Sequence, residues 1–397
     1  MSVNPSANAW VSKLLNILED LKIDSERLYP TLRQKGFIYG TNLSEIYHSP
    51  NNQLNYTQEE LAKLNLLSAL FFVYKNEFPE KDISDFQDQL ILFYEKIQTE
   101  KKHQFFEWPS FRSKPDVQIE KLMQQRIKAN TNLLEKSFSN IVTNTLLNID
   151  VESFKVFCQG NNQIIAFAAH LEAVLINVIS IGLHKKSKKS RYEVLLIKLL
   201  ESSLRYQDTQ IENYEDINAI NFAQFKNKST QLYILDAAAM SIYSDEIVDD
   251  SERLFIHELG NILDLEKNEV DKSIKSVSSF VRKNYNRIPY FNDANPIKNF
   301  YDKTHRSTTL LIIRNKNRLI KELSQSKELL ILLKKSTHAE LSVEEKKIVK
   351  RQLMDIFKSI PSLAIFAIPG GSVLLPIIIK LIPHLLPSAF NENLEDN

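Results

Sequence analysis

The feature that most constrains this 397-residue chain is an uncharged, proline-interrupted run near its C-terminus. The run covers residues 359–379, and as one helix these 21 residues would be about 31 Å long, close to the thickness of a bilayer's hydrocarbon core. A straight helix is disfavoured, because each proline removes a backbone donor and clashes with the preceding turn. The run therefore predicts a kinked or broken helical element that contacts a membrane, or alternatively a buried apolar hairpin.

The rest of the chain has the pattern of long helices. Helix breakers are few: the chain has 7 glycines and 13 prolines, and five of these prolines lie between residues 361 and 387. Between residues 57 and 78 the apolar side chains recur at steps of three and four, which places them on one helix face. Thr57 and Glu60 have the spacing of a capping box at the start of this helix. We expect an all-α fold, with multi-domain helical bundles followed by a C-terminal proline-broken hydrophobic helical element.

The length is sufficient for two or three domains. We predict an N-terminal helical domain over 1–150, a central helical domain over 151–300 and a C-terminal region over 301–397, with its hydrophobic segment at 359–390. The central domain contains the second most apolar stretch, residues 164–183, which predicts a core helix or alternatively a membrane segment. His170 and Glu172 within it are costly in lipid, so the core helix is favoured.

Composition and motifs exclude several classes of function. A formal net charge of +1 leaves no basic excess for binding DNA through its phosphates, and the single cysteine, Cys158, excludes an internal disulfide or a cysteine-based zinc site. His257 and Glu258 begin an H-E-x-x-H pattern that lacks its second histidine. The N-terminus lacks the layout of a cleavable signal peptide, so we expect the bulk of the chain in the cytoplasm. We expect neither catalysis nor a required cofactor.

An acidic turn near the centre of the chain follows an alanine-rich helical pattern. Its carboxylates are Asp245, Asp249, Asp250 and Glu252. Residues 220–285 resemble the TerB (tellurite-resistance) helical fold, in which such a turn follows an alanine-rich helix. The four side chains could hold a divalent cation through hard oxygen ligands, although they lack EF-hand spacing. The alternative is structural: Asp249 caps the next helix and Glu252 completes a capping box.

The C-terminal region resembles the LETM family, the leucine-zipper, EF-hand-containing transmembrane proteins of the mitochondrial inner membrane. Ser342 and Glu345 form a second capping box at the start of a basic helix that leads into the apolar run. The positions that carry the hallmark, and that we take as candidate membrane residues, are Asp355, Phe357, Pro361, Pro369, Gly370, Gly371, Pro376, Lys380, Pro383 and Pro387. Gly370 and Gly371 stand where the family has bulky or acidic residues, which predicts a looser kink here. The family's ribosome-binding region continues beyond the hallmark, whereas this chain ends seven residues after Phe390.

The combination of long N-terminal helices, a TerB-like centre and a LETM hallmark resembles a bacterial family described as LETM-related and biofilm-associated. That resemblance implies a membrane-associated protein linked to cation homeostasis or to biofilm and envelope function. Basic residues before the run predict that it lies at the cytoplasmic face of the inner membrane, with lipid as partner and homo-oligomers as one possible assembly. The alternative is a soluble, cytoplasmic helical interaction protein that binds other proteins or the ribosome.

Overall fold

The computed structural model describes most of the chain. The residues it describes are 3–7, 9–21, 23–47, 56–99, 113–132, 147–186, 216–242, 250–284, 308–309, 312–313, 315–360, 363 and 375–386. Their helices are α1 (Trp10–Glu19), α2 (Ser25–Gln34), α3 (Gln58–Glu77), α4 (Ile83–Thr99), α5 (Pro115–Asn132), α7 (Asn148–Cys158), α8 (Ile164–Lys185), η1 (Ile217–Ala219), α10 (Lys228–Ile242), α11 (Asp250–Ile262), α12 (Lys267–Asn284), α15 (Lys316–Leu323), α16 (Lys327–His338), α17 (Val343–Ser359) and α18 (Leu375–Leu385). These described ranges contain no strand, and the predicted all-α fold is confirmed.

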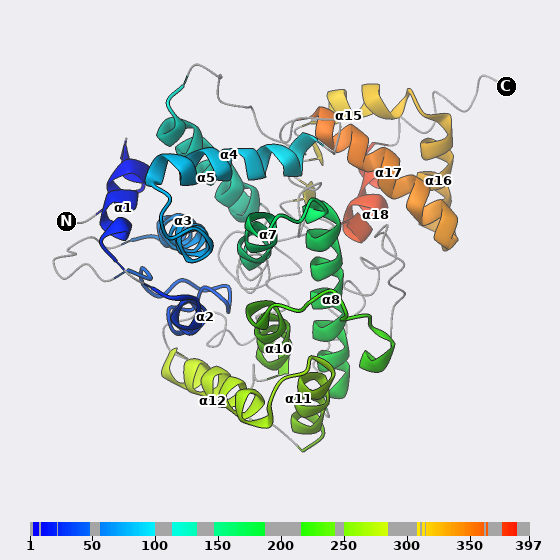
Figure 1. Ribbon diagram of the computed structural model, residues 1–397. Helices are drawn as coiled ribbons and strands as arrows, with labels where there is room; N and C mark the ends of the chain where they lie inside the picture. The colour runs from blue at the N-terminus through cyan, green and yellow to red at the C-terminus, as the bar shows by residue number, and fades with distance from the viewer. Residues whose placement is uncertain are drawn as a thin grey trace.

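Helix α3 forms the centre of the N-terminal part of the molecule (Figure 1). Its start is the predicted capping box, in which the Thr57 hydroxyl accepts from the Glu60 amide and the Glu60 carboxylate accepts from the Thr57 amide. The sequence pattern predicted one apolar face, but every residue from Leu61 to Tyr74 is buried. The reason is that α1, α2, α5 and α7 all pack against α3, so it is enclosed on more than one side.

An aromatic cluster fills the space between α3, α4 and α7. Phe71, Phe86, Phe93 and Phe154 are all buried, and the Phe71 and Phe86 rings meet edge to face with centroids 5.2 Å apart. Phe93 and Phe154 make a similar contact at 5.1 Å. Such edge-to-face pairs add to the gain from burying aromatic surface. The cluster therefore fixes how α4 and α7 lie against α3.

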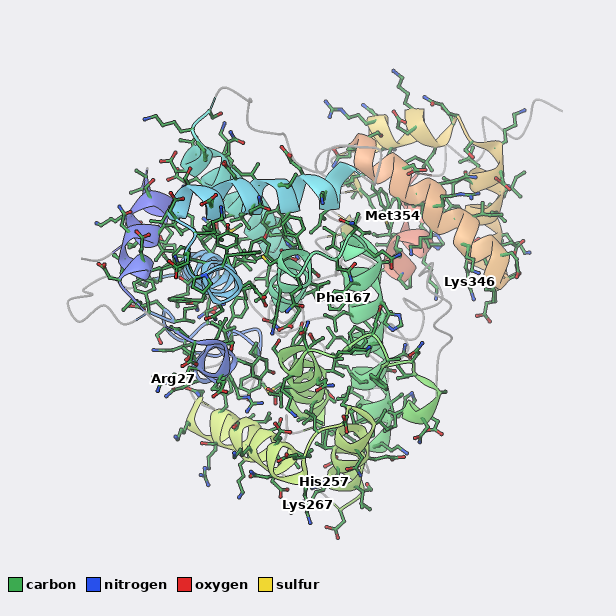
Figure 2. All side chains as sticks on the ribbon, in the orientation of Figure 1. Arg27, Phe167, His257, Lys267, Lys346 and Met354 are labelled. Carbon is green, nitrogen blue, oxygen red and sulfur yellow. The ribbon has the colours of Figure 1, made fainter. Side chains whose placement is uncertain are left out.

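Helix α8 is the apolar stretch predicted at residues 164–183, and it forms one continuous helix of 22 residues. Within the described ranges it is the one helix long and apolar enough to cross a membrane, and 72% of its most apolar window is buried inside the fold. It packs against α7, α10 and α11. Near its start, Phe167 meets the Phe225 ring, with centroids 5.7 Å apart (Figure 2). This packing supports the favoured core-helix interpretation.

The predicted domain boundary at residue 150 falls inside α7, which contacts both α3 on one side and α8 on the other. Side chains also cross the boundary, since Tyr29 of α2 donates to Asp236 of α10 at 2.7 Å. The division into 1–150 and 151–300 stays a prediction.

Glu152 links α7 to α10 and provides a prediction about pH. The hydroxyls of Ser229 and Thr230 donate to its Oε2 at 2.8 and 2.7 Å, and burial raises the pKa of this carboxyl above its ordinary value. The stability it contributes is therefore fully present below the ordinary glutamate pKa of about 4.3 and is lost as the pH rises through the folded-state pKa. Relative to the wild type, Glu152→Gln is expected to gain stability as the pH rises from about 4 towards 7. Urea unfolding of both proteins across this range measures the difference, and a constant offset would contradict the prediction.

Candidate functional site: the C-terminal helical lobe

Helices α15, α16, α17 and α18 gather at the upper right of the molecule in Figure 1 and pack on one another. We call these four helices the C-terminal lobe. Its centre is the pair α16 and α17, joined by a short turn through Ala339 and Ser342. All four helices lie within the predicted C-terminal region, residues 301–397.

Polar contacts at both ends fix α16 and α17 as an antiparallel pair. At one end Gln352 of α17 donates to Glu328 at 2.7 Å and accepts from the Ser326 hydroxyl at 2.5 Å. At the other end Lys335 of α16 donates to Glu345 of α17 at 2.6 Å. This hydrogen bond, together with the Ser342 amide, lowers the pKa of the Glu345 carboxyl. The predicted capping box of Ser342 and Glu345 is confirmed.

Leucine side chains of α16 form the apolar centre of the lobe. Leu329, Leu330 and Leu333 are buried, and Phe357 from α17 is completely buried. The other fully buried members of this centre are Leu319, Leu323, Val349, Leu353, Leu375, Ile378 and Ile382. The lobe thus has an apolar core of its own, built from all four helices.

The uncharged run is not helical at Ile360 and Leu363, on either side of Pro361. Helix α17 ends at Ser359 and the next helix, α18, begins at Leu375, so the run does not form one straight helix. Residues 364–374 lie outside the described part. Helix α18 packs against α16, and its Ile377, Ile378 and Ile379 are buried. The last five residues of the run, 375–379, are therefore covered by protein, as in the alternative of an apolar hairpin.

The candidate membrane residues have different environments. Phe357 and Pro376 are buried, whereas Asp355 and Lys380 are exposed and Pro383 lies half-buried in the last turn of α18. Pro361, Pro369, Gly370, Gly371 and Pro387 lie outside the described residues. The structure therefore places five of the ten hallmark positions, and of these Phe357 and Pro376 are buried in the lobe.

A cleft of about 430 Å³ opens between the end of α16, the start of α17 and one face of α18. Its lining residues are Ser336, Thr337, His338, Ala339, Glu340, Leu341, Lys346, Pro376, Ile379, Lys380 and His384. Lys346 donates to Glu340 at 3.0 Å, and both residues line the cleft. Figure 2 shows Lys346 at the outer end of α17, with Met354 further along the same helix. The sequence analysis gave Lys380 only as a position of the hallmark and did not single out Lys346. The sequence did contain one indication of this cleft. Lys380 and His384 are four residues apart, so on a helix they lie on the same face.

The acidic turn is described only in part. Asp245 and Asp249 lie outside the described residues, Asp250 is the exposed first residue of α11, and Glu252 is buried in the first turn of that helix. In the part of the chain that can be inspected, no group of three or more His, Cys, Asp or Glu side chains is arranged to hold a metal ion. The cation site stays a prediction, as does the capping role of Asp249.

Two residues of earlier interest have structural roles. His170 shares a hydrogen bond of 2.9 Å with the Asn221 carbonyl through Nε2. Cys158 is a half-buried free thiol, and burial raises its pKa to about 12. A thiol with so high a pKa is a poor nucleophile at neutral pH.

Comparison with known families identifies the C-terminal lobe more closely. Residues 341–397 match a family model described as "LETM1-like, RBD". Residues 341–397 are similar to the LETM1-like family. The LETM-like match begins at Leu341, just before the capping box of α17, and covers less than a sixth of the chain. No curated protein and no solved structure matches the chain.

Proposed function

We propose that this protein is a non-enzymatic, membrane-associated, LETM-like protein that attaches to the lipid through its segment 359–390. The observation that carries the proposal is the overlap of two segments of the sequence. The longest uncharged run of the chain lies inside the residues that match the LETM-like family model. A family resemblance confined to this region makes it the part of the chain on which a membrane function depends.

The charges around the run support attachment from the cytoplasmic side. Helix α17 precedes it and carries the exposed side chains of Lys347 and Arg351, with Lys346 and Lys350 on the same helix. Such a basic helix beside an apolar run attracts anionic headgroups, and positive flanks remain on the cytoplasmic side. The lobe is therefore proposed to sit at the cytoplasmic face of the inner membrane.

The helix lengths favour a wedge in the membrane surface over a full span. Helix α18 has 11 residues and is about 16 Å long, roughly half the hydrocarbon core. In addition, α18 packs against α16, and four of its isoleucines, Ile377, Ile378, Ile379 and Ile382, are buried. Helix α8 is long enough to span, but most of its apolar window packs inside the protein. Peripheral attachment through the run is the mode that these lengths and contacts support.

Fractionation with a matched pair of variants tests attachment. Ile365→Asp with Ile368→Asp places two charges in the uncharged run and is expected to move the protein from the membrane pellet to the soluble fraction. The control, Ile331→Asp, places one such charge on an aliphatic side chain of α16 that is 52% exposed, and it should leave the protein in the pellet. Deletion of 359–390 should release the protein as well.

Alkaline carbonate distinguishes the mode of attachment. Wild-type protein is expected to pellet with membranes in buffer and to be extracted by carbonate, as a peripheral protein is. Retention after carbonate would replace the wedge with a spanning segment. Recovery of the wild type in the soluble fraction without any wash would overturn membrane association itself.

The second candidate is a soluble helical interaction protein, and one observation favours it. The part of the run that lies in α18, residues 375–379, packs against α16, which is how an internal hairpin would behave. The matching family model is described as "LETM1-like, RBD". We take RBD to stand for a ribosome-binding domain, so the interaction partner proposed for this candidate is the ribosome. Co-sedimentation of the soluble protein with ribosomes, with and without residues 341–397, tests it.

Roles in cation homeostasis or in biofilm and envelope function are finer proposals within the membrane-associated candidate. The packing of α10, α11 and α12 on one another is consistent with a TerB-like bundle in the centre. A cation-dependent role would use the carboxylates at Asp245, Asp249, Asp250 and Glu252. Calorimetry with calcium, magnesium and manganese tests this role, and heat that is unchanged by Asp245→Asn would rule it out.

A further inference from the structure

The cleft of the C-terminal lobe combines an apolar floor with positive charge from two helices. Leu341 and Ile379 are buried beneath it, and Pro376 completes the floor. Lys346 enters from α17, and Lys380 enters from α18. Two ammonium groups that face one cavity from different helices repel each other unless an anion lies between them.

The charge on Lys346 is unusual for its burial. Its side chain is only 9% exposed, whereas that of Glu340, to which it donates at 3.0 Å, is 72% exposed. A buried ammonium needs a partner, but an exposed carboxylate on a turn can move into water at little cost. Glu340 can therefore be displaced from Lys346 by a stronger anion.

The other groups that line the cleft add polar atoms and no further acid. The hydroxyls of Ser336 and Thr337 already donate their hydrogens to the carbonyls of Leu333 and Lys334. Towards a ligand, these hydroxyl oxygens are therefore mainly hydrogen-bond acceptors. The exposed rings of His338 and His384 lie at the rim. The C-terminal end of α16 carries a partial negative charge that repels an anion. The positive charges of Lys346 and Lys380 must exceed this repulsion for an anion to bind. Among the described lining residues, Glu340 is the single carboxylate.

We infer that this cleft binds a phosphate group, which takes the place of the Glu340 carboxylate against Lys346 and is contacted by Lys380 from the opposite side. A phosphate offers more acceptor oxygens than a carboxylate, so it can accept from both ammonium groups at once. The apolar floor then contacts the carbon part of a phosphate ester. The phosphate could come from a lipid headgroup or from a soluble ester, and both satisfy the same chemistry.

Calorimetry and vesicle flotation with the full chain test this site. The soluble probes are inorganic phosphate and glycerol phosphate, and the lipid probe is a phosphatidylcholine vesicle with and without phosphatidic acid. Lys346→Met is expected to weaken binding by about tenfold or more, and Lys380→Met by about threefold. Glu340→Gln is expected to strengthen binding, because it removes the competing carboxylate.

The control is Lys347→Met, which removes one positive charge from the exposed neighbour of Lys346 on α17. It should bind every probe as the wild type does. Lys380 is exposed, so its replacement tests the site even if Lys346→Met fails to fold. The inference would be overturned if Lys347→Met and Lys380→Met bound the probes equally well. It would also be overturned if the folded wild type bound none of the phosphate probes.

The two sources of phosphate give different patterns. Binding of the soluble probes identifies a soluble ester as sufficient, whereas binding of phosphatidic acid vesicles alone identifies a lipid headgroup. The cleft shares Pro376 and Ile379 with the run, but Ile365 and Ile368 are not among its described lining residues. The variant with Ile365→Asp and Ile368→Asp should therefore retain soluble phosphate binding, so failure of membrane attachment and failure of the cleft are separate results.

Discussion

Arg126→Met is expected to lower the free energy of unfolding by about 3–5 kcal/mol. In the wild type, Nε and one terminal nitrogen of Arg126 donate to the two oxygens of Asp150 at 2.7 and 2.9 Å. The side chains of both residues are about 95% buried. Tyr94 donates to the same carboxylate at 3.1 Å, so this contact joins α4, α5 and the start of α7. Removal of the arginine leaves a buried carboxylate with no cation beside it, which is far more costly than the loss of an exposed pair.

Urea unfolding measures this effect against a matched control. Arg27→Met removes an arginine from the exposed pair with Asp24, whose side chains are 81% and 61% exposed, and should cost less than about 1 kcal/mol. Figure 2 shows Arg27 on α2. A double variant, Arg126→Met with Asp150→Leu, should recover much of the loss because it also removes the unpaired charge. A loss for Arg126→Met no larger than that for Arg27→Met would show that Asp150 reaches water.

The second large effect is expected at Asp236, whose carboxylate is completely buried in α10. Arg33 donates to its Oδ2 from Nε at 2.8 Å and has a terminal nitrogen 2.8 Å from the same oxygen in an ion pair, and Tyr29 donates at 2.7 Å. Ser273 of α12 donates to its other oxygen. Asp236→Leu leaves these donors without an acceptor and should also cost about 3–5 kcal/mol. Because Asp236 connects α2 to α10 and α12, the loss should appear in the unfolding of the N-terminal and central helices together.

A conservative change at the same site provides the comparison. Ser273→Ala removes one neutral donor and should cost about 1 kcal/mol. Adding Arg33→Met to Asp236→Leu should restore part of the stability, since the guanidinium no longer lacks its partner. Thermal unfolding followed by circular dichroism gives both values. If Asp236→Leu left the N-terminal helices as stable as in the wild type, α2 would be held by its apolar contacts alone.

Local features of the fold could be predicted from the sequence with accuracy. The capping boxes at Thr57 and Ser342 depend on residues three apart, and both form as expected. The helix over 164–183 and the interruption of the C-terminal run follow in the same way from apolar periodicity and from proline. The spacing of the prolines also identified the LETM-like region before any comparison.

Contacts between distant segments could not be predicted in this way. Tyr29 and Asp236 are 207 residues apart, and no local pattern selects them as partners. The cleft was missed for the same reason: Glu340 and Lys346 meet Lys380 only after α18 has packed against α16. The one-sided pattern of α3 was also incomplete, because the sequence does not say how many neighbours a helix will have.

By itself the sequence determined the all-α class, the helix ends that carry capping boxes, and the position of the LETM-like, proline-broken segment. Only the tertiary structure decided that α8 lies among α7, α10 and α11, and that α18 turns its isoleucines towards α16. The physical reason is that an apolar side chain gains in a similar way from leaving water for lipid or for a protein interior. Hydrophobicity therefore predicts that such a helix is covered, and the packing of the remaining chain determines by what.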